Sequence, residues 1–422
     1  GRWARVPLAA ALAGLTGGER SAPRQLWLDA GANALPLAAL WLADNERRAL
    51  PDGAVAVHLT ADPLAALARD GELPRDLTKL SSEMAALVRF CAGRLPGSSA
   101  IGVTTVTHHE AGADPVQELA FTVATLLEYV RRLADSGLSA AEVAASTRLR
   151  LAVGSQVFVE IAKLRAVRLL WRAALGAVGV AAAPAPILHV VGSRRTLTRR
   201  QPELNLLRGC EQAFAAACGG ADAISVWGYD HARGAVSARA RRLARNTALI
   251  LRHEGLVSRV EDPGGGSFLV EALTRQLCER AWTLAQEIER QGGMSRLLLS
   301  GQVAAWVDES ARRRARVYES GDAGITGVTH YVLDESEAAE PAPAAAAPEA
   351  AAERLERHRS TWSAPSVEID YSRDFVVEEL LARARRGETV AELGARLGDG
   401  ESAERAEVLT PRRDAAPFEE AS

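Results

Sequence analysis

Several features typical of membrane and nucleic-acid-binding proteins are missing from this 422-residue chain. No run of 18 or more apolar residues is free of charge, so no segment is suited to span a bilayer. The net charge is -3 at pH 7, which argues against a general nucleic-acid binder. Lysine occurs only at Lys79 and Lys163, and we attribute the arginine excess to coding bias rather than to phosphate recognition. We therefore expect neither a membrane nor a nucleic acid as a partner.

Cysteine is scarce, and the four thiols lie far apart. They form no CxxC pair and no cluster with histidine, and three of them lie in apolar helical patterns that are typical of buried free thiols. A reducing cytoplasm fits this pattern. The positions are Cys91, Cys210, Cys218 and Cys278. The chain also lacks a GxSxG element, a P-loop and a GxGxxG fingerprint.

The composition is that of a globular protein, because 48% of the residues are hydrophobic and the length suffices for a full core. Short β-like segments alternate with longer helical patterns from about residue 24 to 330. We expect strands at 54–59, 100–107, 148–154, 186–192 and 222–228. About six strands precede an all-helical pattern that begins near residue 270.

Two helix starts are well marked. Asp62 is a candidate N-cap followed by Pro63 at the first helical position. Asp114 is a second candidate N-cap, with Pro115 next and Gln117 at the capping-box position. Repeated β-then-α units of this length predict a parallel sheet, and a (β/α)8 TIM-type barrel is favoured over a doubly wound sheet.

We expect residues 1–334 to form this barrel without part of its N-terminal end. The segment "GRWARVPLAAALAGLTGG" partly resembles a signal peptide. We interpret it instead as part of a domain, so that the sequence would begin partway through that domain. Residues 335–353 are rich in Ala, Pro and Glu and predict a solvated linker. Residues 354–422 have one helical stretch, too little for a core, so we expect a helical tail that packs on a neighbour.

The segment "TVTHHEAGADPVQELAF" (105–121) places His108, His109 and Glu110 directly after an expected strand. Their spacing lacks the i, i+4 helical face of an HExxH zinc site, so we predict no metal site. In α/β barrels the loops after the strands carry binding and catalysis. Two interpretations therefore stay open. These residues lie at a pocket, functional or vestigial, or they form a loop without a chemical role.

Other motifs have ordinary interpretations as the first choice. Gly264, Gly265 and Gly266 precede a helix, where a tight turn is favoured over an anion site at the helix start. The basic runs 193–201 and 312–316 are interpreted as solvated faces or interface residues, with a CoA-phosphate contact as the alternative. The tryptophans of apolar patterns, Trp171 and Trp227, are expected in the core.

Four stretches together resemble the methylmalonyl-CoA mutases, coenzyme-B12-dependent acyl-CoA isomerases. They are "EAGADPVQELAFTVATLLEYVRRL", "FVEIAKLRAVRLLW", "LARNTALILRHEGLVSRVEDPGGGSFLVEALT" and "ERAWTLAQEIERQGGMS". The likeness covers roughly residues 50 to 330 in order, and the DPxxGSxxVExLT element followed by ERAW and GGM is highly specific. The resemblance implies a (β/α)8 barrel threaded by acyl-CoA and capped by a cobalamin-binding domain. That domain's DxHxxG motif is not matched here, since "DHARG" at 230–234 has the wrong spacing. The closing "RRDAAPFEE" resembles the segment that leads into it.

The resemblance also implies that the catalytic groups are missing. Catalytic members carry Tyr-His in GYHMQEAG, and those two positions hold Val106 and Thr107. In the RTHSQTSG element the arginine that would grip the substrate carboxylate is Ile187. The glutamine of the following strand becomes Asp222, which would repel an acidic acyl group. No catalytic residue is therefore predicted. A vestigial pocket is predicted instead, made of His108, His109, Glu110, His189, Asp222 and Glu271.

This pattern is that of the family's small subunit. The implied partner is a catalytic large subunit in a heterodimer, which binds adenosylcobalamin and the acyl-CoA, while this chain alone holds no cofactor. One alternative is a divergent mutase chain that is itself active with a separate cobalamin-binding subunit. Another is a stand-alone CoA- or metal-binding barrel that uses His108, His109 and Glu110.

Overall fold

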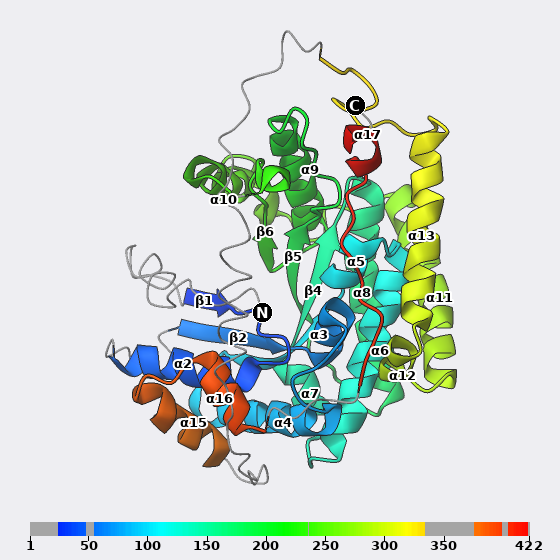
Figure 1. The fold of residues 1–422 in the computed structure, drawn as a ribbon. Helices are drawn as coiled ribbons and strands as arrows, with labels where there is room; N and C mark the ends of the chain where they lie inside the picture. The colour runs from blue at the N-terminus through cyan, green and yellow to red at the C-terminus, as the bar shows by residue number, and fades with distance from the viewer. Residues whose placement is uncertain (1–23, 48–54, 235, 334–374, 399–403, 421–422) are drawn as a thin grey trace.

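A single parallel sheet organises the chain (Figure 1). The computed structural model describes residues 24–47, 55–234, 236–333, 375–398 and 404–420, and in this part six strands pair in chain order. The strands are β1 (Arg24–Trp27), β2 (Val55–Ala61), β3 (Ser99–Thr104), β4 (Thr147–Val153), β5 (Ile187–Gly192) and β6 (Ala223–Ser225). The sheet is curled, as in half of a TIM-type barrel. The predicted parallel α/β architecture is confirmed.

Helices connect the strands and dominate the chain after β6. Those within the sheet region are α2 (Ala34–Arg47), α3 (Pro63–Asp70), α4 (Leu77–Arg94), α5 (Val106–Ala111), α6 (Pro115–Ala134), α7 (Ala140–Ser146), α8 (Val157–Ala177) and α9 (Leu204–Cys218). The later ones are η1 (His231–Arg233), α10 (Ala238–His253), η2 (Val257–Arg259), α11 (Phe268–Arg290), α12 (Met294–Leu299), α13 (Gln302–Glu319), α15 (Phe375–Arg385), α16 (Val390–Arg396) and α17 (Ala416–Glu420). Among the described helices none is long and apolar enough to cross a membrane.

The two faces of the sheet differ in chemistry because successive side chains point to opposite sides. The face turned to the helices is apolar and belongs to the main core, for example Leu149, Leu151 and Val190, each fully buried. Its opposite, concave face carries polar groups. Arg148 and Arg150 of β4 lie on it, in register with neighbouring positions of β5.

The caps predicted from sequence are present. The Asp62 carboxylate accepts a hydrogen bond from the backbone N–H of Ala65, and Pro63 opens α3. Asp114 and Gln117 form a reciprocal capping box at the start of α6, which fixes where this long core helix begins.

The segment after β3 corrects the sequence interpretation. The expected strand 100–107 ends at Thr104, and the expected loop is instead the one-and-a-half-turn helix α5. Gly112 ends this helix at φ 130°, and its N–H bonds the carbonyls of His108 and His109. A Cβ at Gly112 would lie 2.5 Å from the Cβ of Ala311, so glycine also permits the close approach of α13.

Segments near the C-terminus return to the sheet region. Helix α15 buries Val377 and Leu380 against the main core, in contact with α2, and Arg385 pairs with Glu46 at 2.6 Å. The chain from 404 to 420 (red in Figure 1) then runs along α3 and α5. Its backbone N–H groups bond the carbonyls of Gly71 and Glu110 at 2.9 and 2.8 Å.

Candidate functional site

Helix α5 holds the two histidines and the glutamate at the carboxyl end of β3, and their side chains point in three different directions. His108 packs its ring against Phe121 of α6, with the ring centroids 5.1 Å apart. Both of its ring nitrogens are buried without a hydrogen-bond partner. Burial lowers the pKa of His108 to about 4, so this residue is a neutral packing group.

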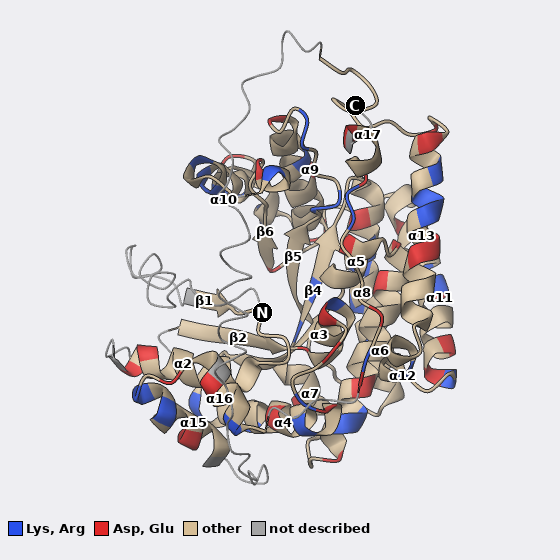
Figure 2. Ribbon diagram, viewed as in Figure 1, with Lys and Arg blue, Asp and Glu red and all other residues tan. Residues whose placement is uncertain are grey.

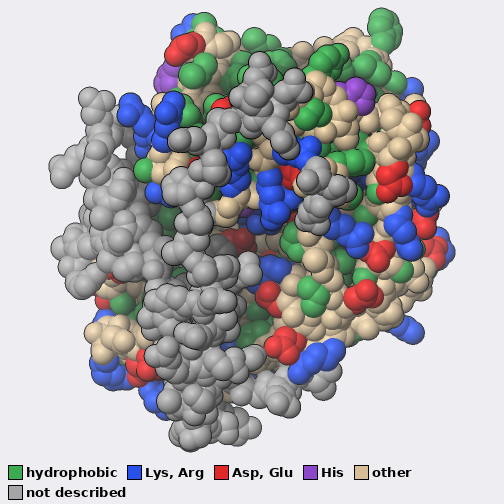
Figure 3. Space-filling view, turned by 45° about the horizontal axis from the view of Figure 1, so that its top comes forward, with side chains coloured by type: hydrophobic (Ala, Val, Ile, Leu, Met, Phe, Trp, Pro, Cys, Tyr) green, Lys and Arg blue, Asp and Glu red, His purple; other side chains and the backbone are tan. Residues whose placement is uncertain are grey.

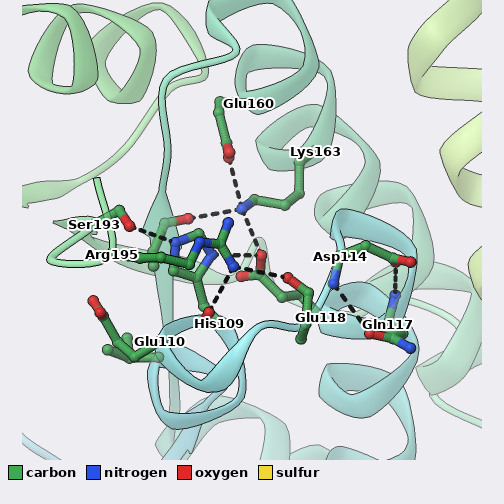
Figure 4. Close-up of polar contacts among 12 residues, drawn as sticks. His109, Glu110, Asp114, Gln117, Glu118, Glu160, Lys163, Ser193 and Arg195 are labelled. Carbon is green, nitrogen blue, oxygen red and sulfur yellow. Dashed lines mark hydrogen bonds and ion pairs between the residues drawn. The ribbon is translucent and has the colours of Figure 1, made fainter. Parts of the chain in front are cut away.

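His109 lies in a buried polar network (Figure 4). Its Nδ1 is 2.8 Å from Oε1 of Glu118, and its Nε2 is 2.8 Å from the hydroxyl of Ser193. This geometry suits a neutral ring that donates to the carboxylate and accepts from the serine. Burial and the nearby Arg195 hold the pKa of His109 well below its usual range.

Lys163 of α8 lies at the centre of this network and is fully buried. Its ammonium lies 3.1 Å from Glu118, 2.6 Å from Glu160 and 2.8 Å from the carbonyl of Ala152. Burial alone would lower the pKa of Lys163, but the two carboxylates together raise it, so it stays charged. The Lys163 ammonium thus compensates part of the negative charge of two buried carboxylates.

Glu110 faces the β5–α9 loop rather than its neighbour His109. Its carboxylate accepts a hydrogen bond from the backbone N–H of Arg194 at 2.9 Å, and burial raises its pKa. Arg195 of the same loop is only 7% exposed and donates to the carbonyl of His109 at 2.7 Å. The interpretation of the run 193–201 as solvated is therefore wrong at Arg195, because α5 offers it buried carbonyl oxygens.

Val106 and Thr107, at the family's Tyr-His positions, open α5. Val106 is 7% exposed and packs with Ala152 of β4 and Val191 of β5, with Trp227 against them. This apolar cluster joins the carboxyl ends of three strands. Thr107 is half-buried, and no hydrogen bond of its side chain is found among the described residues.

His189 lies in the middle of β5 on the concave face, apart from the α5 network. Its Nε2 is 2.8 Å from the hydroxyl of Ser225, and its ring lies 4.8 Å from that of Trp27. The ring of His58 lies 4.3 Å from the same tryptophan. Burial lowers the pKa of His189 to about 3 and that of His58 to about 4, so both are neutral.

Ile187 and Asp222 lie at the amino ends of β5 and β6. Ile187 opens β5, so five residues, about 16 Å, separate it from the carboxyl end where Val106 lies. The Asp222 carboxylate accepts a hydrogen bond from the N–H of Leu188 at 2.7 Å. The structure therefore does not bring these two positions together with α5.

Glu271 lies on another part of the surface, at the start of α11. Its carboxylate pairs with Arg165 at 2.8 Å and accepts from the N–H of Gly266 at 3.1 Å. The bond to Arg165 lowers the pKa of Glu271. Gly266 has φ 78°, which fits the tight turn favoured from sequence. Of the six pocket residues predicted, only those of α5 lie together, and they face different neighbours.

The arrangement at the carboxyl end of the sheet is suited to holding α5 in place. Within the described ranges no three His, Cys, Asp or Glu side chains are grouped to hold a metal ion. A carboxylate, an imidazole and a hydroxyl do line up in Glu118, His109 and Ser193, but all three are at most 1% exposed, so no substrate reaches the serine. The sequence analysis missed Glu118, Glu160 and Lys163. The sequence feature that could have identified them is the presence of charged residues inside otherwise apolar helical stripes.

Comparisons with known proteins identify the relatives of this sequence. The sequence model of the family described as methylmalonyl-CoA mutase matches residues 24–393. A methylmalonyl-CoA mutase small subunit of Streptomyces virginiae is 41% identical over 334 residues, covering 78% of this chain and 53% of that protein. A probable methylmalonyl-CoA mutase small subunit of Mycobacterium tuberculosis (strain ATCC 25618 / H37Rv) is 38% identical over 316 residues, 72% of this chain and 49% of that protein.

A more distant relative carries the full family name. The methylmalonyl-CoA mutase of Escherichia coli (strain K12) is 31% identical over 253 residues, 60% of this chain and 35% of that protein. The chain spans about half the length of the small subunits that it matches. With a family match over most of its length, the chain belongs to the methylmalonyl-CoA mutase family.

Proposed function

We propose that this chain belongs to a small subunit of a coenzyme-B12-dependent acyl-CoA mutase, which interconverts methylmalonyl-CoA and succinyl-CoA. In this proposal the chain is not catalytic. It supports a large subunit in a heterodimer, and the large subunit carries the acyl-CoA and the chemistry. The names of the relatives, which are small subunits, support the pairing.

The observation that carries the proposal is the environment of Val106. A position where catalytic relatives are expected to present a tyrosine holds an aliphatic side chain packed against Ala152 and Val191. Neither Val106 nor the adjacent Thr107 offers the hydrogen bonds of a tyrosine-histidine pair to a substrate. Of the two histidines that follow on α5, His108 packs against Phe121 and His109 is bonded on both ring nitrogens inside the core.

Adenosylcobalamin is expected in the complex, and the residues of this chain do not fit it. At the carboxyl end of the sheet both α5 histidines are buried, which leaves neither ring available to a cofactor. We therefore assign the cofactor to the partner and derive no step through it here.

The finer domain plan is part of the same proposal. Residues 1–334 would belong to a (β/α)8 barrel, 335–353 would be a linker, and 354–422 a helical tail that leads toward a cobalamin-binding-like domain. Limited proteolysis with mass spectrometry tests this division. First cuts within 335–353 would support it, and first cuts within 100–230 would contradict it.

The functional test is an assay with adenosylcobalamin and methylmalonyl-CoA. The chain alone should give no succinyl-CoA, and the complex with its co-expressed large subunit should be active. Replacing the tyrosine of the partner's YHMQEAG motif should abolish that activity, because the chemistry resides there. Turnover by the isolated chain would refute the non-catalytic role, and failure to co-purify with a large subunit would refute the pairing.

A further inference from the structure

A cavity of ≈ 370 Å³ is lined by residues of α9, of the end of α13 and the segment after it, and of the C-terminal segment just before α17. It borders the α5 network at Asp414, which pairs with Arg195. Three charged side chains line it, Arg208, Glu211 and Asp414. Its apolar wall includes Leu204, Leu207 and Ile325. The volume lies within the range of specific binding pockets, so the cavity can receive a sizeable group.

Two of the three charges already have partners. The Arg208 guanidinium donates to the Asn205 side chain at 2.8 Å and to the carbonyl of Thr326 at 2.7 Å. Asp414 lies 3.7 Å from Arg195 and 4.0 Å from Arg314.

Glu211 is different. Its carboxylate is half-buried and makes no hydrogen bond or ion pair within the described residues. Burial raises its pKa, and Arg208 opposes this shift. A cation delivered into the cavity would give this half-buried carboxylate a direct ion pair in addition to the attraction of Arg208.

The outer face of α9 surrounds Glu211 with apolar groups. Leu207 lies one turn before Glu211 and Phe214 one turn after it on this face, and they are 68% and 41% exposed. Cys210 is exposed between them. Figure 3 shows hydrophobic side chains next to arginines on the side of the molecule that carries α9 and α10. Exposed apolar side chains grouped around a pocket are typical of a protein interaction site.

We propose that α9 and this cavity form a docking site for a segment of the large subunit that has an apolar face and one arginine or lysine. The cationic end enters the cavity and pairs with Glu211, and its aliphatic stem contacts Leu207. This inference rests on the proposed pairing of subunits. A small cationic ligand would fill the cavity and leave Phe214 in water. A symmetric contact between two copies would bring Glu211 near Glu211, so like charges disfavour it.

The test compares variants of the complete small subunit in binding to the large subunit, measured by calorimetry at low and high salt. Glu211→Gln should weaken binding by about tenfold or more and flatten its salt dependence, because a charge pair is lost. Leu207→Ser should weaken binding at both salt concentrations. The control is Glu254→Gln, an exposed glutamate directly after the neighbouring helix α10, which should bind like the wild type. Thermal unfolding of each variant checks that the fold is retained.

The outcomes separate the two proposals. Wild-type affinity of both the Glu211 and the Leu207 variant would overturn the docking site while the pairing of subunits stands. Absence of binding by the wild type would overturn the pairing itself, and the docking site with it. The small subunit alone could instead form concentration-dependent dimers that the Leu207→Ser exchange abolishes. That result would contradict the large subunit as the occupant of the docking site and would indicate a second copy of this chain.

Discussion

Nδ1 of His109 and Oε1 of Glu118 lie 2.8 Å apart in the interior, with each side chain 1% exposed. The same carboxylate oxygen is 3.1 Å from the ammonium of Lys163. One oxygen thus joins α5 to α6 and α8. His109, which the sequence marks by its histidine neighbour, therefore contributes to the contact between these three helices.

Removing Lys163 should destabilise the fold strongly. Lys163→Met leaves two buried carboxylates, Glu118 and Glu160, without their cation, and the cost should be about 3–5 kcal/mol in the free energy of unfolding. Urea denaturation followed by circular dichroism measures it. The matched control is the chain's other lysine, Lys79, which is exposed. Lys79→Met should change the free energy of unfolding by less than about 0.5 kcal/mol. Equal effects of the two exchanges would contradict the network.

His108→Leu should remove one source of acid sensitivity. The pKa of His108 is about 4 in the fold against an ordinary value of 6.5, so the unfolded state takes up the proton first as the pH falls. The contribution of His108 to the free energy of unfolding is fully present above pH 6.5. As the pH falls from 6.5 to about 4, this contribution decreases by about 1.4 kcal/mol per pH unit. Unfolding free energies measured from about pH 7 to 4.5 should therefore diverge between wild type and variant.

The control for acid sensitivity is an exposed histidine. His253→Leu, at the end of α10, should follow the wild-type pH curve. Parallel curves for the wild type and His108→Leu would show that His108 takes up a proton in the folded state without cost.

Much of the fold was predictable because its signals are local. The strands are short apolar runs, and the caps at Asp62 and Asp114 are residue types whose side chains bond the next turn. Helix α5 was not predictable, since six residues are too few to form a helix on propensity alone. Its form depends on the close approach of α13 at Gly112, a contact about 200 residues distant in sequence.

The candidate site was harder to predict than the fold. The resemblance to the family places Val106 and Thr107 at the tyrosine and histidine positions, and neither residue type supplies a phenol or an imidazole. The bond from His109 to Ser193 spans 84 residues, so no sequence pattern announces it. Asp222 lies directly before β6, where its carboxylate accepts a hydrogen bond from the N–H of Leu188 in β5, and its place in a vestigial pocket stays a prediction.

Gly112→Ala should cost more than the same exchange at another glycine of positive φ. Both Gly112 and Gly179 have positive φ, at 130° and 88°, but only the first has a neighbour in the way, because an added Cβ would lie 2.5 Å from that of Ala311. Gly179→Ala should cost about 1 kcal/mol from backbone strain. Gly112→Ala adds overpacking of about 1–3 kcal/mol, which chemical denaturation can measure. Equal losses in the two variants would mean that α13 moves freely away from α5.

Restoring one catalytic residue should not restore catalysis. Thr107→His places an imidazole at the family position, yet Val106 beside it stays in its apolar cluster with Ala152 and Val191. Catalytic groups act as a unit, so one member without the others contributes almost nothing. The variant chain alone, assayed with adenosylcobalamin and methylmalonyl-CoA, should form no detectable succinyl-CoA. In complex with the large subunit it should match the wild-type complex, because the reaction takes place in the partner. Turnover by the isolated variant would contradict the expected inactivity of this chain and the location of the reaction in the partner. It would show that the active site lies in this chain.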